Sequence, residues 1–221
     1  MSRAFYSIVA TLGIIGTLSC NSATAAVNIP DPAVDAPLAS AKGQQTMVVA
    51  GGCFWGIQAV FQHVKGVKRA TSGYSGGKAN TAHYEMVSTG KTGHAESVEV
   101  VFDPSRITYG QLLKVFFSVA HDPTQLNRQG PDTGTQYRSV IFYSDPDQQR
   151  IAQAYIDQLN QARAFPVPIV TQVVPLTTFY PAEDYHQDYA TLHPDQPYIV
   201  INDLPKVANL RKEFPNLYVA R

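Results

Sequence analysis

Cys53 lies in a segment whose residue types favour nucleophilic chemistry, Gly51-Gly52-Cys53-Phe54-Trp55-Gly56. The apolar run 46–50 before it predicts a buried strand, and the pattern of 57–64 after it predicts an amphipathic helix. Unsatisfied N–H groups and the dipole at the start of a helix favour an anion, so we expect Cys53 to favour the thiolate, the nucleophilic form of cysteine. The alternative is a small buried hydrophobic residue at the start of a core helix.

The second cysteine of the chain, Cys20, lies in an N-terminal segment that resembles an export signal. Arg3 precedes the uncharged, mostly apolar run 4–18, and Ala23-Thr24-Ala25 is typical of a cleavage site, so residues 1–26 are expected to be a secretory signal peptide. Cleavage there discards Cys20; lipidation of Cys20 is the lesser alternative. An exported domain with a single thiol cannot form an internal disulfide, and such a leftover cysteine is typically reactive.

The remaining chain is expected to form one domain. Residues 27–45 are rich in proline, alanine and aspartate without periodicity, which indicates a flexible leader, and 46–221 is expected to be a single catalytic domain. The whole chain has no formal net charge, and loss of Arg3 with the signal peptide leaves −1. This balance gives no support for a nucleic-acid or anionic-membrane partner, and no membrane span is expected.

Strand-like and helix-like segments alternate along this domain. Strands are predicted over 67–74, 97–102, 138–143 and 169–174, and helices over 108–120, 146–163 and 202–214. Asp145 and Pro146 have the residue types of a helix N-cap and first helical position. The expected fold class is therefore α/β (α+β), a two-layer sandwich in which helices pack on a central mixed sheet.

Several polar loops carry further candidates for chemistry. Glu96, at the start of a valine-rich strand, would have a raised pKa if it were desolvated and could then act as a general acid; the alternative is an exposed strand-end carboxylate. Tyr84 and Tyr137 are either hydrogen-bond donors in a site or core aromatic residues whose hydroxyl reaches solvent. Asp132 either orients a partner or caps a turn. These residues alone do not decide between the two interpretations.

The histidines give little support for a metal site. No H-x-x-x-H pair occurs and no second cysteine lies nearby, so a zinc site is not expected. The histidines that could serve as metal ligands are His83, His94, His121 and His186.

Six motifs, in this order, resemble the peptide methionine sulfoxide reductase family, class A. The resemblance covers roughly 47–192. The motifs are Gly-Cys-Phe-Trp-Gly (52–56), Gly-Tyr-Ser-Gly-Gly (73–77), Gly-His-Ala-Glu (93–96), His-Asp-Pro (121–123), Gly-Thr-Gln-Tyr-Arg-Ser (134–139) and Ala-Glu-Asp-Tyr-His (182–186).

The resemblance implies a ferredoxin-like core and an enzyme that returns methionine-S-sulfoxide, free or in oxidised proteins, to methionine, as a repair activity after oxidative damage. Cys53 would attack the sulfoxide sulfur and become a sulfenic acid, and Glu96 would protonate the sulfoxide oxygen. The remaining implied roles are hydrogen-bond donors to that oxygen (Tyr84, Tyr137), an acidic group near the site (Asp132), and substrate binding (Phe54, Trp55, His186).

The C-terminal region departs from many family members, because residues 191–221 contain no cysteine that could attack the sulfenic acid. We therefore expect a one-cysteine enzyme without a bound cofactor, recycled by an external thiol reductant such as thioredoxin, glutaredoxin/glutathione or dithiothreitol. The expected setting is periplasmic or secreted, with a monomer as the default.

Three other functions fit the sequence less well. A Cys–His hydrolase would pair Cys53 with His186 or His94. A thiol peroxidase would need a small polar pocket, which Phe54 and Trp55 do not favour. A non-catalytic module that binds methionine would keep its function without the thiol of Cys53.

Overall fold

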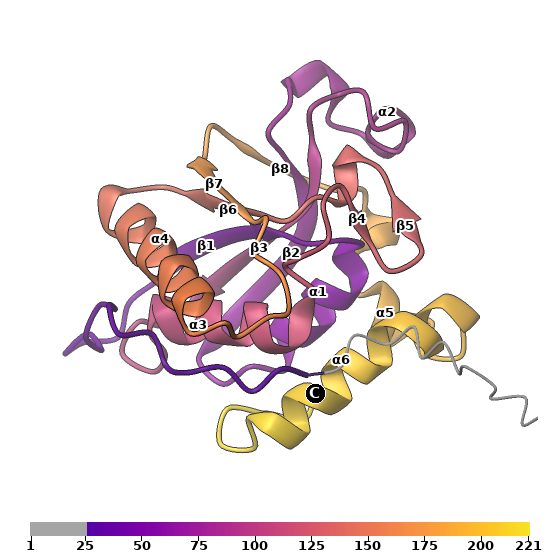
Figure 1. Cartoon of the computed structure of the whole chain (residues 1–221). Helices are drawn as coiled ribbons and strands as arrows, with labels where there is room; N and C mark the ends of the chain where they lie inside the picture. The colour runs from indigo at the N-terminus through magenta and orange to yellow at the C-terminus, as the bar shows by residue number, and fades with distance from the viewer. Residues whose placement is uncertain (1–25) are drawn as a thin grey trace, which may run out of the picture.

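The computed structural model describes residues 26–221 (Figure 1). The predicted signal peptide, including Cys20, lies almost entirely outside the described residues. Among the residues described, no helix is both long and apolar enough to cross a membrane.

A six-stranded sheet forms the centre of the domain, with strands in the order β7-β6-β1-β3-β2-β8. All neighbouring pairs are antiparallel except β6 and β7, which are parallel, so the sheet is mixed as predicted. The strands are β1 (Gln45–Ala50), β2 (Val67–Ser75), β3 (Ala95–Phe102), β6 (Val140–Tyr143), β7 (Gln172–Pro175) and β8 (Phe179–Pro181); a separate hairpin pairs β4 (Arg128–Gln129) with β5 (Asp132–Thr133).

Four of the strands confirm the ferredoxin-like core. Along the chain, the core reads β1, α1 (Phe54–Gln62), β2, β3, α3 (Tyr109–Val115) and β6, a βαββαβ sequence of elements. In the sheet these strands lie in the order β6-β1-β3-β2, and each is antiparallel to its neighbours. The fold class predicted from the alternation of elements is therefore confirmed.

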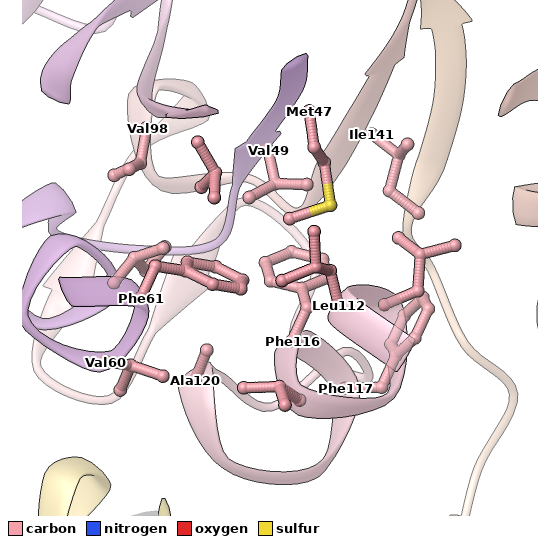
Figure 2. Packing of buried hydrophobic residues seen from close by; sticks show 14 of the residues in the cluster. Met47, Val49, Val60, Phe61, Val98, Leu112, Phe116, Phe117, Ala120 and Ile141 are labelled. Atoms are coloured by element: carbon pink, nitrogen blue, oxygen red, sulfur yellow. The ribbon is translucent and has the colours of Figure 1, made fainter. Parts of the chain in front are cut away.

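Alternation along β1 explains how the sheet is covered. Met47 and Val49 point to one face and join the main core, in which α1 and α3 contribute Phe61, Leu112 and others (Figure 2). Val48 and Ala50 point to the opposite face, where a smaller cluster forms with Phe142, Leu176 and Phe179. The helices therefore lie mainly on one face, and the segment around β7 and β8 covers part of the other.

Local signals fix the ends of the longer helices. Thr108 and Gln111 form a reciprocal capping box at the start of α3, which continues as a π-helical turn, η2 (Phe116–Ala120). Asp145 caps α4 (Pro146–Gln161) by accepting from the amide of Gln148, as predicted. The remaining helical segments are η1 (Ala79–Thr81), α2 (Tyr84–Val87), η3 (Thr135–Tyr137), η4 (Asp184–His186), α5 (Tyr189–Leu192), η5 (Ile199–Asp203) and α6 (Leu204–Glu213).

Residues 27–45 differ from the expected flexible leader, because they pack against the domain. Ile29 is only 2% exposed and belongs to the main core. The hydroxyl of Tyr155 in α4 donates to the Pro30 carbonyl at 2.7 Å, and the amide of Gly110 in α3 donates to the Asp35 carboxylate at 2.9 Å. Composition alone suggested a tether, but one apolar side chain and a few well-placed acceptors attach the segment to α3 and α4.

Candidate active site

Cys53 occupies the N-cap position of α1, directly after the turn that leaves β1. Gly52 has φ +98°, a conformation that a side chain strongly disfavours. A Cβ on Gly51 would lie 2.7 Å from Cγ of His121, and one on Gly52 would lie 2.5 Å from Cγ of Gln129. The two glycines therefore let the turn fit between these side chains and fix the position of the sulfur.

The resting protonation state of Cys53 differs from the expectation. Burial raises the pKa of its thiol well above the ordinary value, and the nearby Glu96 and Asp203 act in the same direction. The backbone at Trp55 and the charge of Lys206 favour the thiolate but do not outweigh burial. The helix N-terminus thus contributes as predicted, yet Cys53 rests as a thiol because its side chain is removed from water.

Glu96 on β3 is a buried carboxyl beside the nucleophile. It is 2% exposed, and its Oε2 accepts a hydrogen bond of 3.1 Å from the amide of Phe54. Burial raises the pKa of Glu96 to about 8, although the bond from Phe54 opposes this rise. The interpretation of Glu96 as an exposed strand-end carboxylate is wrong, and at neutral pH the group is a neutral acid that can donate a proton.

Tyr84 and Tyr137 reach the same site from two loops. Tyr84 begins α2 and Tyr137 ends η3, and both side chains are partly buried. Burial, followed by the field of Glu96, raises the pKa of both phenols, and Cys53 acts on both in the same direction. Both hydroxyls therefore stay protonated and are able to donate hydrogen bonds near the sulfur and the carboxyl.

Asp132 on β5 interacts with a residue that the sequence analysis missed. The Tyr198 hydroxyl donates to Oδ2 of Asp132, and the Tyr198 ring meets Trp55 edge-on, with centroids 6.0 Å apart. Burial raises the pKa of Asp132, while Tyr198 and Lys206 lower it. No local motif surrounds Tyr198; its position is set by the packing of the C-terminal segment on α1.

Aromatic side chains form a wall beside Cys53. The indole Nε1–H of Trp55 donates to Nδ1 of His186 at 3.3 Å, and the Trp55 ring stacks on Tyr189 with centroids 3.9 Å apart. Phe54 and Tyr84 also lie against the imidazole of His186, with centroid distances of 5.0 and 4.6 Å. His186 is buried, so it packs behind these aromatic rings and helps to hold them in place.

Glu183 connects this wall to the loop of Tyr84 and was also missed as an individual residue. Its Oε1 accepts from the backbone amide of Tyr84 at 2.9 Å, and its Oε2 accepts from the hydroxyl of Tyr74 at 2.8 Å. Nε2 of His186 lies 3.9 Å from the same Oε2. The only sequence signal was its place in the Ala-Glu-Asp-Tyr-His motif.

The histidines of the hydrolase alternative have other partners. His186 accepts from Trp55, and both ring nitrogens of His94 lie within hydrogen-bond distance of backbone atoms, at Gly77 and Lys78. Within residues 26–221, no group of three or more histidine, cysteine, aspartate or glutamate side chains is placed to hold a metal ion. The structure therefore brings a thiol, a neutral carboxylic acid and two phenols together, with aromatic rings beside them.

Comparison with known proteins gives a consistent result. A family model described as peptide methionine sulfoxide reductase matches residues 45–217. The peptide methionine sulfoxide reductase MsrA 2 of Mesorhizobium japonicum is 65% identical over 179 residues, or 81% of this chain and 92% of that protein. The namesake protein of Synechocystis is 54% identical over 188 residues, covering 84% and 88% of the two chains. The solved structure of methionine sulfoxide reductase A of Corynebacterium diphtheriae is 34% identical, with a TM-score of 0.60 and coverage of 80% of this chain and 91% of that one.

Proposed function

The chain belongs to the peptide methionine sulfoxide reductase family, class A, and from this premise we propose how its own residues carry out the reaction. The protein is an oxidoreductase that reduces methionine sulfoxide and so serves protein repair. The proposal assigns Cys53 as the nucleophile, Glu96 as the acid, Tyr84 and Tyr137 as hydrogen-bond donors, and Phe54 with Trp55 as the binding surface for the S-methyl group.

The burial of the Glu96 carboxyl beside Cys53 is the observation that carries this proposal. A sulfoxide sulfur is a poor electrophile until its oxygen gains a proton, and a buried carboxyl with a pKa of about 8 holds that proton at neutral pH. Its bond to the amide of Phe54 keeps it beside Cys53, the preceding residue. Two protonated phenols next to it can orient the sulfoxide oxygen.

The reaction transfers one oxygen atom. The sulfur of Cys53 forms a bond to the sulfoxide sulfur as the oxygen takes a proton from Glu96, and the thiol proton of Cys53 passes to the Glu96 carboxylate. The hydroxyl then moves from the substrate sulfur to the Cys53 sulfur: the substrate sulfur–oxygen bond and the new sulfur–sulfur bond break as a sulfur–oxygen bond forms on Cys53. Methionine leaves, and Cys53 is a sulfenic acid. Two external thiols complete the cycle, giving a disulfide between them, one water and the Cys53 thiol.

The substrates, reductant and location form the rest of the proposal. We propose that both oxidised proteins and free methionine-S-sulfoxide are substrates. Because Cys53 is the one cysteine in residues 26–221, an external thiol, whether thioredoxin, glutaredoxin/glutathione or dithiothreitol, must resolve the sulfenic acid. The signal-like N-terminus supports export to the periplasm or beyond, with lipidation of Cys20 as a lesser alternative, and we propose a monomer.

A single-turnover experiment tests the proposal. The protein lacking residues 1–25 is mixed with a methionine-S-sulfoxide peptide without reductant, and peptide and protein are analysed by mass spectrometry. A peptide lighter by one oxygen together with a dimedone adduct on Cys53 supports the assignment. An unchanged peptide, or reduction by a Cys53→Ser variant, would overturn it. The R epimer of the peptide serves as the matched control and should stay unreduced.

A further inference from the structure

A buried ion pair lies behind the helix that carries Cys53. Asp203 ends η5 and Lys206 belongs to the first turn of α6; Nζ of Lys206 and Oδ1 of Asp203 are 3.1 Å apart. The two residues are 0% and 5% exposed, which is uncommon for charged side chains. Burial of two charges rarely stabilises a fold more than apolar residues of similar size, so this pair calls for a functional reason.

Gly56 brings the ion pair close to the start of α1. A Cβ on Gly56 would lie 2.1 Å from Oδ1 of Asp203 and 2.8 Å from Nζ of Lys206. The pair therefore occupies the space that a side chain at this position would fill. Because residues three apart lie on the same face of a helix, Gly56 places the two charges on the same side of α1 as Cys53.

One oxygen of the ion pair has no hydrogen-bond partner among the described residues. Oδ2 of Asp203 is buried and has no hydrogen-bond partner, whereas Oδ1 contacts Lys206. In surroundings of low polarity, electrostatic interactions at short range are stronger than in water. A group close to the pair therefore experiences the negative charge of Asp203 and the positive charge of Lys206 with opposite effects.

We infer that Asp203 and Lys206 are electrostatic partners of Cys53 that bias it in opposite directions, Lys206 toward the thiolate and Asp203 toward the thiol. After burial and Glu96, Asp203 has the next effect on the Cys53 pKa, which it raises, and Lys206 lowers that pKa.

Other titratable groups also face Cys53 and must stay unchanged in any test. Four of these groups come from β3, α2, η3 and the residue just before η5. Two more lie close to the ion pair itself. Those facing Cys53 are Glu96, Tyr84, Tyr137 and Tyr198, and those close to the pair are Asp132 and His121. The inference concerns the site proposed above, but the test below needs no methionine sulfoxide.

The rate at which iodoacetamide alkylates Cys53 as a function of pH tests the inference. Below the midpoint, this rate follows the thiolate fraction, so a pKa change of one unit alters it about tenfold. We expect Lys206→Met to slow alkylation near pH 8 about tenfold or more and Asp203→Asn to accelerate it by a comparable factor. In the double variant the two effects should largely cancel.

The opposite signs distinguish an electrostatic role from a structural one, because damage to the site would shift both variants in the same direction. Lys212→Met and Glu213→Gln are matched controls, since they change the same charges in an ion pair at the other end of α6 and should leave the rate unchanged. If Lys206→Met does not fold, Asp203→Asn decides alone: faster alkylation supports the inference and slower or unchanged alkylation overturns it. Opposed shifts in a protein that fails to reduce the sulfoxide peptide would sustain this inference and refute the proposed function.

Discussion

The backbone amide of Phe54 donates to Oε2 of Glu96 at 3.1 Å, so the residue that follows the nucleophile holds the acid. These residues come from α1 and β3, and the bond joins the start of the helix to a central strand. Any shift of α1 along its axis would move the sulfur and the carboxyl together. A main-chain hydrogen bond therefore helps to fix the distance between nucleophile and acid.

Replacing Glu96 by glutamine should remove the acid and keep this bond, because the amide oxygen of glutamine can still accept from Phe54. We expect kcat/KM for a methionine-S-sulfoxide peptide to fall by about 10²- to 10⁴-fold. In the wild-type protein kcat/KM should also decline as pH rises through about 8, where Glu96 loses its proton. An unaltered decline in Glu96→Gln would show that another group causes it.

Glu96 should also make the stability of the fold depend on pH. Its pKa is about 8 in the folded protein and close to 4.5 when exposed, so the folded state holds the proton more tightly. The stabilisation from this proton is complete below about pH 4.5 and is lost as pH rises through about 8. Urea unfolding at several pH values should show Glu96→Gln gaining a few kcal/mol on the wild type across this range, and a constant difference would contradict the assignment.

Glu183 is expected to act by positioning Tyr84. Glu183→Ala removes the acceptor for the Tyr84 amide and should lower kcat about tenfold, with a smaller change in KM, because a misplaced phenol binds the transition state less well. In a double-mutant cycle with Tyr84→Phe the losses should be less than additive. Tyr74→Phe removes only the second bond to Glu183 and is the control. Full additivity would mean that Glu183 acts independently of Tyr84.

Gly52 should tolerate no side chain. In Gly52→Ala, a Cβ at φ +98° would also lie 2.5 Å from Cγ of Gln129, so we expect a loss of about 3 kcal/mol or more in unfolding free energy. Gly130→Ala is a matched control, since Gly130 has φ +55° and nothing within 4 Å of the added carbon. It should lose only about 1 kcal/mol. Equal losses in the two variants would mean that contact with Gln129 is unimportant.

The N-terminal segment should contribute measurably to stability. Ile29→Ala removes a side chain that is 2% exposed and should cost about 2 kcal/mol or more in unfolding free energy. Leu38→Ala, in the same segment, removes a side chain that is 52% exposed and should cost under about 0.5 kcal/mol. Chemical denaturation measures both. Indistinguishable midpoints would restore the view of 27–45 as a free leader.

The parts of the fold that were predictable from sequence are those that depend on local residue patterns. The apolar run in β1 and the cap at Asp145 depend on near neighbours, so they indicated both elements correctly. Attachment of the N-terminal segment depends on Ile29 meeting a core assembled from distant elements, and composition does not reveal it. The short strand β8 pairs with β2 by backbone contacts over three residues, too few for a periodic signal.

In the site, too, local motifs were predictable from sequence, and features that arise from packing between distant elements were not. The motif around Cys53 marked the nucleophile, but the burial of Glu96 that raises its pKa arises from packing between β3 and α1. Asp203 and Lys206, three residues apart at a helix start beside Pro205, have the spacing of an ordinary surface pair. Only the docking of η5 and α6 against α1 makes them buried neighbours of Gly56, in the helix that begins directly after Cys53.

Because Cys53 is the one thiol in residues 26–221, the reaction of this thiol can be used to count active molecules of that part of the chain. Under the proposed mechanism, each molecule should reduce one equivalent of sulfoxide and then stop without reductant, because residues 26–221 contain no second cysteine to release Cys53 or to react with dimedone. The size of the first burst without reductant therefore counts competent molecules directly. In a preparation of the protein starting after residue 25, loss of thiol, burst size and oxygen removed from the substrate must agree one to one.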